Sequence, residues 1–196
     1  MKPFIRKNFF TAVWILLLGS LLFYPPAKIF LLRLFINTGI FNAGTKKETN
    51  ISQEGLAPNF SFIDQKGIKQ NTADLKGKVI FINFWATWCP PCVAEMGSVN
   101  ALYDKLKDDP RFVFIIADTD NNFLQSISFM KKNKYDLPVY GLASSIPENL
   151  FTGTIPTTLI IDANGSIVQK HEGIANYDTE DMVKFLQSLV IIPGRG

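Results

Sequence analysis

The stretch that decides the fold runs Val79-Ile80-Phe81-Ile82-Asn83-Phe84-Trp85-Ala86-Thr87-Trp88-Cys89-Pro90-Pro91-Cys92. Its first seven residues are apolar except for Asn83, and such a run predicts a central strand that is buried on both faces. Beyond Cys92 the apolar residues recur at spacings of three and four, which predicts an amphipathic helix from Pro90 to about Lys107. The two cysteines therefore lie where a buried strand ends and a helix begins.

Patterns on either side of this stretch predict one α/β domain. Strand patterns cover 59–63, 112–117, 137–140, 157–162 and 166–170, and helical patterns cover 122–134, 147–151 and a last helix that starts at Asp178. Consecutive strand, helix and strand form a right-handed parallel unit. We therefore expect a mixed central sheet with helices on both sides, an N-terminal hairpin, and an extra helix and strand inserted at 122–140.

The charge is distributed unevenly along the chain. The net charge is +3, but residues 1–44 hold five basic residues and no acidic one, so the remaining 15 basic and 17 acidic residues give the rest of the chain a charge of −2. A mildly acidic globular part without a basic stripe argues against a nucleic-acid partner.

An uncharged segment near the N-terminus predicts a membrane anchor. Residues 8–27 lie between Lys7 and Lys28 without a charge, and a helix of that length spans about 30 Å, one hydrocarbon core. The basic residues at 2, 6 and 7 favour the cytoplasmic side. We therefore expect a single-pass protein of the inner (cytoplasmic) membrane with its catalytic domain in the periplasm or outside. The alternative is a cleaved signal peptide, but the sequence lacks the small-residue pair that cleavage needs.

Composition divides the chain into three parts: a signal anchor over 1–36, a flexible linker over 37–54 and a globular domain over 55–192. The apolar run at 29–36 either lies in the outer membrane interface or lengthens the anchor helix. The linker is rich in small and polar residues, and at full extension it reaches roughly 60 Å. The domain is thus expected to search a considerable volume above the bilayer.

The cysteine content points to redox chemistry. Cys89 and Cys92 are the only two cysteines, and His171 is the only histidine, which is too few ligands for a structural zinc site. A disulfide across two residues constrains the unfolded chain very little. At a helix N-terminus, backbone N–H groups and the helix dipole stabilise a thiolate. We therefore expect an accessible, acidic Cys89 as the nucleophile and Cys92 as the resolving thiol, with no metal and no cofactor besides this pair.

Together with Gly153-Thr154-Ile155-Pro156-Thr157, the motif 84–92 resembles the thioredoxin superfamily, and most closely its membrane-anchored TlpA/ResA-like branch, which includes cytochrome c maturation reductases. The resemblance covers about residues 55–190 and implies a thioredoxin-like fold. It implies that Pro156 is a cis-proline beside the sulfurs and that Ile155 offers its backbone to a substrate.

The same resemblance assigns roles to further residues. Glu95 would accept a proton from a thiol, and Asn83 replaces the buried acid that cytosolic thioredoxins carry on this strand. Trp88, Pro90 and Pro91 would contribute to the surface that binds the substrate. For Trp85 the sequence favours neither of two positions, in that surface or in the hydrophobic core.

The expected function is thiol-disulfide exchange with exported proteins, most simply as a reductant in cytochrome c maturation or periplasmic thiol homeostasis. Exported protein disulfides or thiols are then the partners. In an oxidising space such a reductant needs a membrane electron donor. The alternatives are a peroxiredoxin-like thiol peroxidase and a non-catalytic binding module with the thioredoxin fold.

Overall fold

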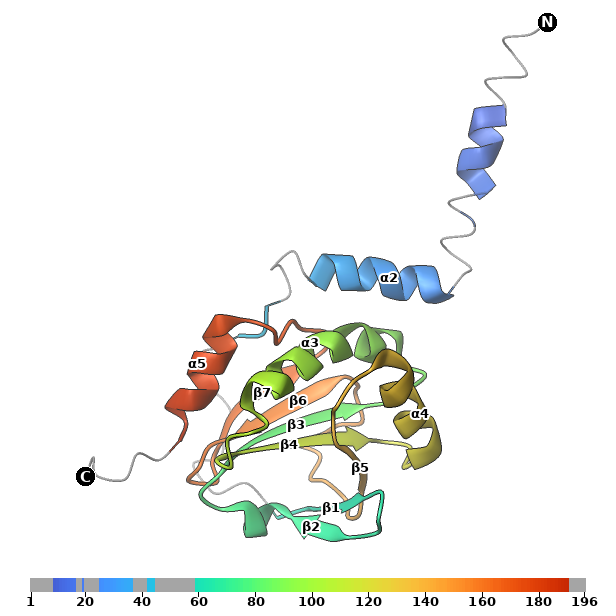
Figure 1. Cartoon of the computed structure of the whole chain (residues 1–196). Helices are drawn as coiled ribbons and strands as arrows, with labels where there is room; N and C mark the ends of the chain where they lie inside the picture. The colour runs from blue at the N-terminus through green and yellow to red at the C-terminus, as the bar shows by residue number, and fades with distance from the viewer. Residues whose placement is uncertain (1–8, 17–18, 20–24, 37–41, 45–58, 191–196) are drawn as a thin grey trace, which may run out of the picture.

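The computed structural model of the chain describes residues 9–16, 19, 25–36, 42–44 and 59–190. A seven-stranded sheet in the order β2-β1-β5-β4-β3-β6-β7 forms the domain (Figure 1). The strands are β1 (Ser61–Asp64), β2 (Lys69–Asn71), β3 (Val79–Trp85), β4 (Phe112–Asp118), β5 (Val139–Leu142), β6 (Thr157–Ile161) and β7 (Ile167–Glu172). The helices are α2 (Pro25–Ile36), the 3-10 helix η1 (Thr72–Leu75), α3 (Pro90–Leu106), α4 (Phe123–Asn133) and α5 (Glu180–Ser188).

The centre of the sheet is parallel and its edges are antiparallel. β3 pairs in parallel with β4, and β4 with β5, whereas the other neighbours run antiparallel. Both parallel crossovers step across the sheet in the same direction, so right-handed connections bring α3 and α4 to the same face. The mixed sheet, the leading hairpin and the inserted helix and strand are confirmed.

The two faces of the sheet are covered differently. Most of the buried apolar side chains of α3, α4 and α5 belong to one hydrophobic cluster, together with Phe81 and Trp85 of β3. Ile80, Ile82 and Phe84 point to the other face and pack in a second cluster with Leu75 of η1 and with residues 146–151. In Figure 1 α3 crosses over the strands with α5 and α4 to either side, and β1 and β2 continue the sheet beyond β5 at the bottom of the view, next to η1.

The predicted helix at 147–151 is wrong, and the helix that packs on the second face is the 3-10 helix η1, through Leu75. Residues 148–150 form a turn in which the N–H groups of Leu150 and Phe151 donate to Pro147 O. A single turn between Pro147 and Gly153 cannot recover the cost of helix nucleation. The turn still covers the second face, because Phe151 stacks on Phe84 with ring centroids 4.4 Å apart.

The last helix begins one residue later than predicted. Thr179, not Asp178, is the N-cap of α5, and its Oγ1 accepts a hydrogen bond of 3.1 Å from Met182 N. The Asp178 carboxylate instead pairs with Lys105 Nζ at 2.8 Å. Both residues are good caps; in the structure Thr179 caps the helix and Asp178 forms the ion pair.

The N-terminal part contains two helical segments. One covers 9–16, and the other is α2, which begins at Pro25. Among the residues that the structure describes, no helix is long and apolar enough to cross a membrane. Part of the predicted anchor, including 17–18 and 20–24, lies outside the described residues. Helix α2 packs beside α3. Its Arg33 Nη2 donates to Val93 O at 3.4 Å, and Ile36 is only 3% exposed.

The short segment 42–44 is held against the domain, so the flexible-linker prediction is wrong at these residues. Asn42 forms a parallel bridge with Asn176, and Ala43 N donates to Asn176 O at 3.0 Å. Gln169 Nε2 donates to Gly44 O at 2.6 Å. Small residues without charge fit this position because Ala43 is buried. The rest of the predicted linker, 37–41 and 45–54, lies outside the described residues.

Candidate active site

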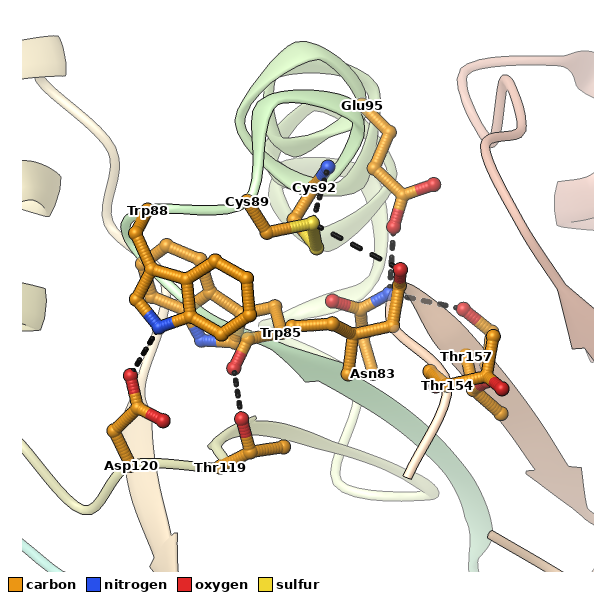
Figure 2. The surroundings of a disulfide bond; sticks show 12 residues. Asn83, Trp85, Trp88, Cys89, Cys92, Glu95, Thr119, Asp120, Thr154 and Thr157 are labelled. Carbon is orange, nitrogen blue, oxygen red and sulfur yellow. Dashed lines mark hydrogen bonds between the residues drawn. A yellow bond between two sulfur atoms is a disulfide. The ribbon is translucent and has the colours of Figure 1, made fainter. Parts of the chain in front are cut away.

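The two cysteines form a disulfide at the start of α3 (Figure 2). Cys89 is the N-cap of the helix, and its Sγ accepts a hydrogen bond of 3.3 Å from Cys92 N. Pro90 and Pro91 occupy the first helical positions and have no N–H. The first N–H that the helix offers is therefore that of Cys92, and it is directed at the sulfur of Cys89.

The cysteines differ in exposure. Cys89 is 3% exposed and Cys92 is fully buried, so the small opening to solvent belongs to the residue predicted as the nucleophile. In the oxidised pair Cys89 is therefore less accessible to solvent than predicted. Trp88, by contrast, is 65% exposed, and it forms an apolar surface directly before Cys89.

The loop before β6 forms the second wall of the site. The Ile155–Pro156 peptide bond is cis, as predicted, and Ile155 O lies 3.9 Å from Cys89 Sγ. Pro156 O is held by Gly173 N at 2.8 Å. A partner that reaches Cys89 must therefore pass the backbone of Ile155.

Glu95 lies one turn after Cys92 on α3 and is fully buried. Its Oε1 accepts from Asn83 Nδ2 at 2.9 Å, and its Oε2 accepts from Ala175 N at 3.0 Å. Figure 2 shows the carboxyl group on the side of the helix that faces Asn83 of β3. The structure thus brings the predicted proton acceptor and the strand amide into direct contact, to one side of the disulfide in Figure 2.

Burial raises the pKa of Glu95 to about 8, and the hydrogen bonds from Asn83 and Ala175 oppose this shift. The cause is desolvation, since an apolar interior penalises the charged carboxylate. A group with this pKa exchanges protons with thiols near neutral pH.

Two further residues extend the polar network. Thr158 Oγ1 accepts hydrogen bonds from Asn83 Nδ2 at 2.9 Å and from the Tyr177 hydroxyl at 2.7 Å. Burial raises the pKa of Tyr177 well above its ordinary value, so the hydroxyl stays neutral and can donate. Sequence reasoning missed Thr158 and Tyr177, although Thr158 follows the cis-proline by two residues and so had to lie near the motif.

The loop after β4 supports the tryptophans. Trp88 Nε1 donates to Asp120 Oδ2 at 2.5 Å, and Thr119 Oγ1 donates to Trp85 O at 3.3 Å. These contacts were not predicted, but the parallel pairing of β3 with β4 places 118–120 beside 85–88. Trp85 is fully buried and packs on Phe129, so it belongs to the core.

Within the described residues no group of three or more histidine, cysteine or acidic side chains is arranged to hold a metal ion. His171 lies on β7 opposite Thr158. The chemistry that the arrangement offers is that of the cysteine pair and the neighbouring carboxyl group.

Comparisons with known proteins agree with this geometry. The family model described as Redoxin matches residues 53–186, more than half of the chain. The chain belongs to the Redoxin family. The chain is also 37% identical over 146 residues to the thiol-disulfide oxidoreductase ResA of Bacillus cereus, covering 74% of this chain and 81% of the relative. The ResA of Bacillus subtilis is 31% identical over 172 residues, covering 81% and 93%.

A solved structure of a thiol:disulfide interchange protein from Chlorobium tepidum is similar as well. It superposes with a TM-score of 0.56 at 27% identity, and the match covers 70% of this chain and 97% of that one. This redoxin is therefore a ResA-like thiol-disulfide oxidoreductase with a thioredoxin-like fold. Such enzymes work with a redox-active cysteine pair and need no cofactor.

Proposed function

We propose that this oxidoreductase is anchored in the cytoplasmic membrane by residues 8–27 and uses Cys89 and Cys92 to reduce disulfides of exported proteins. The observation that carries the assignment of the cysteines is the position of the pair: Cys89 caps α3 and receives the Cys92 N–H, and the buried Glu95 follows Cys92 by three residues on the same helix. The apolar segment and the preceding basic residues support the anchor.

The reduced pair would act in two steps. The Cys89 thiolate attacks one sulfur of a partner disulfide, forms a mixed disulfide, and releases the other partner sulfur as a thiolate. Cys92 then gives its proton to Glu95 and attacks Cys89 Sγ, which frees the second partner thiol and closes the Cys89–Cys92 disulfide. Two electrons pass to the partner, and Trp88, Pro90, Pro91 and the Ile155–Pro156 backbone line its approach.

The oxidised pair must then be reduced again. In an oxidising compartment neither glutathione nor a cytosolic thioredoxin is at hand, so the electrons come from a membrane donor. A reductant role fits cytochrome c maturation, in which a Cys-x-x-Cys-His pair has to be reduced before haem attachment. Periplasmic thiol homeostasis is the broader version of the same role.

A redox titration of the full-length chain against glutathione tests the direction. A reductant should have a potential nearer to about −270 mV than to about −120 mV, the range that such pairs cover. A peptide that contains an oxidised Cys-x-x-Cys-His sequence provides the substrate assay. A potential near the oxidising end, or peroxide turnover faster than reduction of this peptide, contradicts the proposal.

The location has its own test. Carbonate-washed membranes should retain the full-length chain, and a membrane-impermeant maleimide added to intact, reduced cells or spheroplasts should label Cys89. Release of the chain by carbonate, or labelling only after lysis, contradicts the anchored, outward-facing arrangement.

A further inference from the structure

The buried amide of Asn83 has an unusual set of partners. Its Nδ2 donates both to Glu95 Oε1 and to Thr158 Oγ1, each at 2.9 Å. Its Oδ1 is also buried, yet it has no hydrogen-bond partner among the residues that the structure describes. Buried amide oxygens normally accept a hydrogen bond. The two hydrogen bonds that Nδ2 donates must therefore stabilise the observed orientation of the amide.

The hydrogen bonds that Glu95 receives in this orientation fit only one of its protonation states. Both carboxyl oxygens face donors, Asn83 Nδ2 and Ala175 N. Two donors suit a carboxylate, which accepts at both oxygens. A protonated Glu95 carries an O–H that needs an acceptor, and neither of these partners is one.

Rotation of the amide by 180° supplies that acceptor. Oδ1 and Nδ2 have nearly the same size, so exchanging them changes the hydrogen bonds but not the packing. After the rotation Oδ1 accepts from the Glu95 O–H and from the Thr158 hydroxyl, which can turn its hydrogen toward it while it still accepts from Tyr177. On the far side Nδ2 replaces an oxygen that has no described partner, so the bonds that Oδ1 gains from Glu95 and Thr158 have to offset the two N–H groups left without an acceptor there.

We propose that Asn83 is a positioning residue whose side-chain amide turns over with the protonation state of Glu95, donating to the carboxylate and accepting from the acid. The amide thereby gives the carboxyl group a partner in both states of its proton exchange. This inference rests on the proposed function only in that Glu95 exchanges a proton with a cysteine.

Other titratable groups around Glu95 are few. Cys89 and Cys92 of α3 are joined in the disulfide, Tyr177 faces Glu95 from the β7–α5 loop, and His171 lies opposite Thr158 on β7. In the oxidised chain the cysteines do not titrate, so the carboxyl group can be followed without them.

The direct test is NMR titration of the oxidised full-length chain in detergent micelles. With glutamate labelled by ¹³C at the carboxyl carbon, six signals are expected, and the signal missing in Glu95→Gln identifies Glu95. We expect its midpoint near pH 8. With asparagine labelled by ¹⁵N, the side-chain signal missing in Asn83→Leu should shift with the same midpoint, and that shift should vanish in Glu95→Gln.

The variants add a second measurement. Asn83→Leu removes the donor to the carboxylate, so the Glu95 midpoint should rise by about one pH unit or more. Gln169→Leu is the matched control, because Gln169 is a buried amide that also has an unpartnered oxygen but donates to Gly44 O. It should leave the midpoint unchanged.

Two outcomes overturn the proposal: an Asn83 amide signal that stays constant while Glu95 titrates, or a Glu95 midpoint that Asn83→Leu does not move. The wild-type titration needs no variant, so a misfolded Asn83→Leu chain does not remove the test. Failure to reduce the Cys-x-x-Cys-His peptide would count against the proposed function and would leave these signals unaffected.

Discussion

The backbone N–H of Cys92 donates to Sγ of Cys89 over 3.3 Å, with two prolines between them that have no N–H to offer. The two sulfurs of the pair are therefore not equivalent. One receives the first N–H of a helix and has the remaining exposed surface, and the other is fully buried.

This asymmetry predicts which cysteine forms the bond to a partner. With Cys92→Ala, the full-length chain should accumulate a mixed disulfide through Cys89 when it is mixed with an oxidised Cys-x-x-Cys-His peptide. With Cys89→Ala the adduct should be at least about tenfold less abundant, because Cys92 is inaccessible and lacks the stabilised thiolate. Mass spectrometry of the two variants measures both yields, and equal yields would refute the assignment.

The buried carboxyl group predicts a stability that falls with pH. The pKa of Glu95 rises from 4.5 to about 8 on folding, so the folded state binds more protons than the unfolded state between these values. The stabilisation is complete below about pH 4.5 and is lost as the pH rises through about 8. At about 1.4 kcal/mol per pH unit the loss is at most about 5 kcal/mol.

Urea unfolding of the oxidised chain at several pH values measures this decline. Glu95→Gln should flatten it between pH 5 and 8, whereas Glu148→Gln, at an exposed position, should not. A Glu95→Gln chain with the same decline as the wild type would show that another group causes it.

The contact between Trp88 and Asp120 predicts an effect on substrate binding alone. Asp120→Ala removes the acceptor of the indole N–H and frees the ring that precedes Cys89. KM for the oxidised peptide should rise about three- to tenfold, the equivalent of one hydrogen bond. Alkylation of reduced Cys89 by iodoacetamide should keep its rate.

The matched control is Asp136→Ala, which removes an exposed aspartate that pairs with Lys107. It should change neither KM nor the alkylation rate. A slower alkylation in Asp120→Ala would instead place Asp120 in the electrostatics of the thiolate.

The packing of α2 on α3 predicts that a buried charge will separate them. Ile36 is 3% exposed and Leu34 is 51% exposed on the same helix. Ile36→Asp removes apolar burial of about 2 kcal/mol and adds the desolvation cost of a carboxylate. Hydrogen exchange of the α2 amides should accelerate by at least about tenfold, while Leu34→Asp should leave it near the wild-type rate. Equal exchange in both variants would mean that the packing contributes no stability.

Local patterns predicted most of the domain because each depends on neighbours in sequence. The apolar run 79–85 became β3 and the prolines after Cys89 became the start of α3. The cis bond before Pro156 followed from the resemblance. Glu95 lies on the same side of α3 as Cys92 because residues three apart on a helix share a face.

The features that were missed depend on contacts between distant segments. Nothing within residues 42–44 signals that they pair with Asn176, more than 130 positions away. Tyr177 has the pattern of an ordinary loop residue, and only the fold brings its hydroxyl to Thr158. The turn at 147–151 has helix-like hydrogen bonds over one turn only. The segment is too short to continue as a helix, although its composition resembles one.

The bridge between Asn42 and Asn176 limits how far the domain that carries the disulfide can move from α2. Residues 37–41 separate Ile36 of α2 from Asn42, and even a fully extended chain of that length covers only about 21 Å. Since both ends of this short piece are attached to the same domain, α2 and the helix that carries Cys89 stay side by side. A partner that approaches the disulfide therefore meets α2 in a constant position relative to α3.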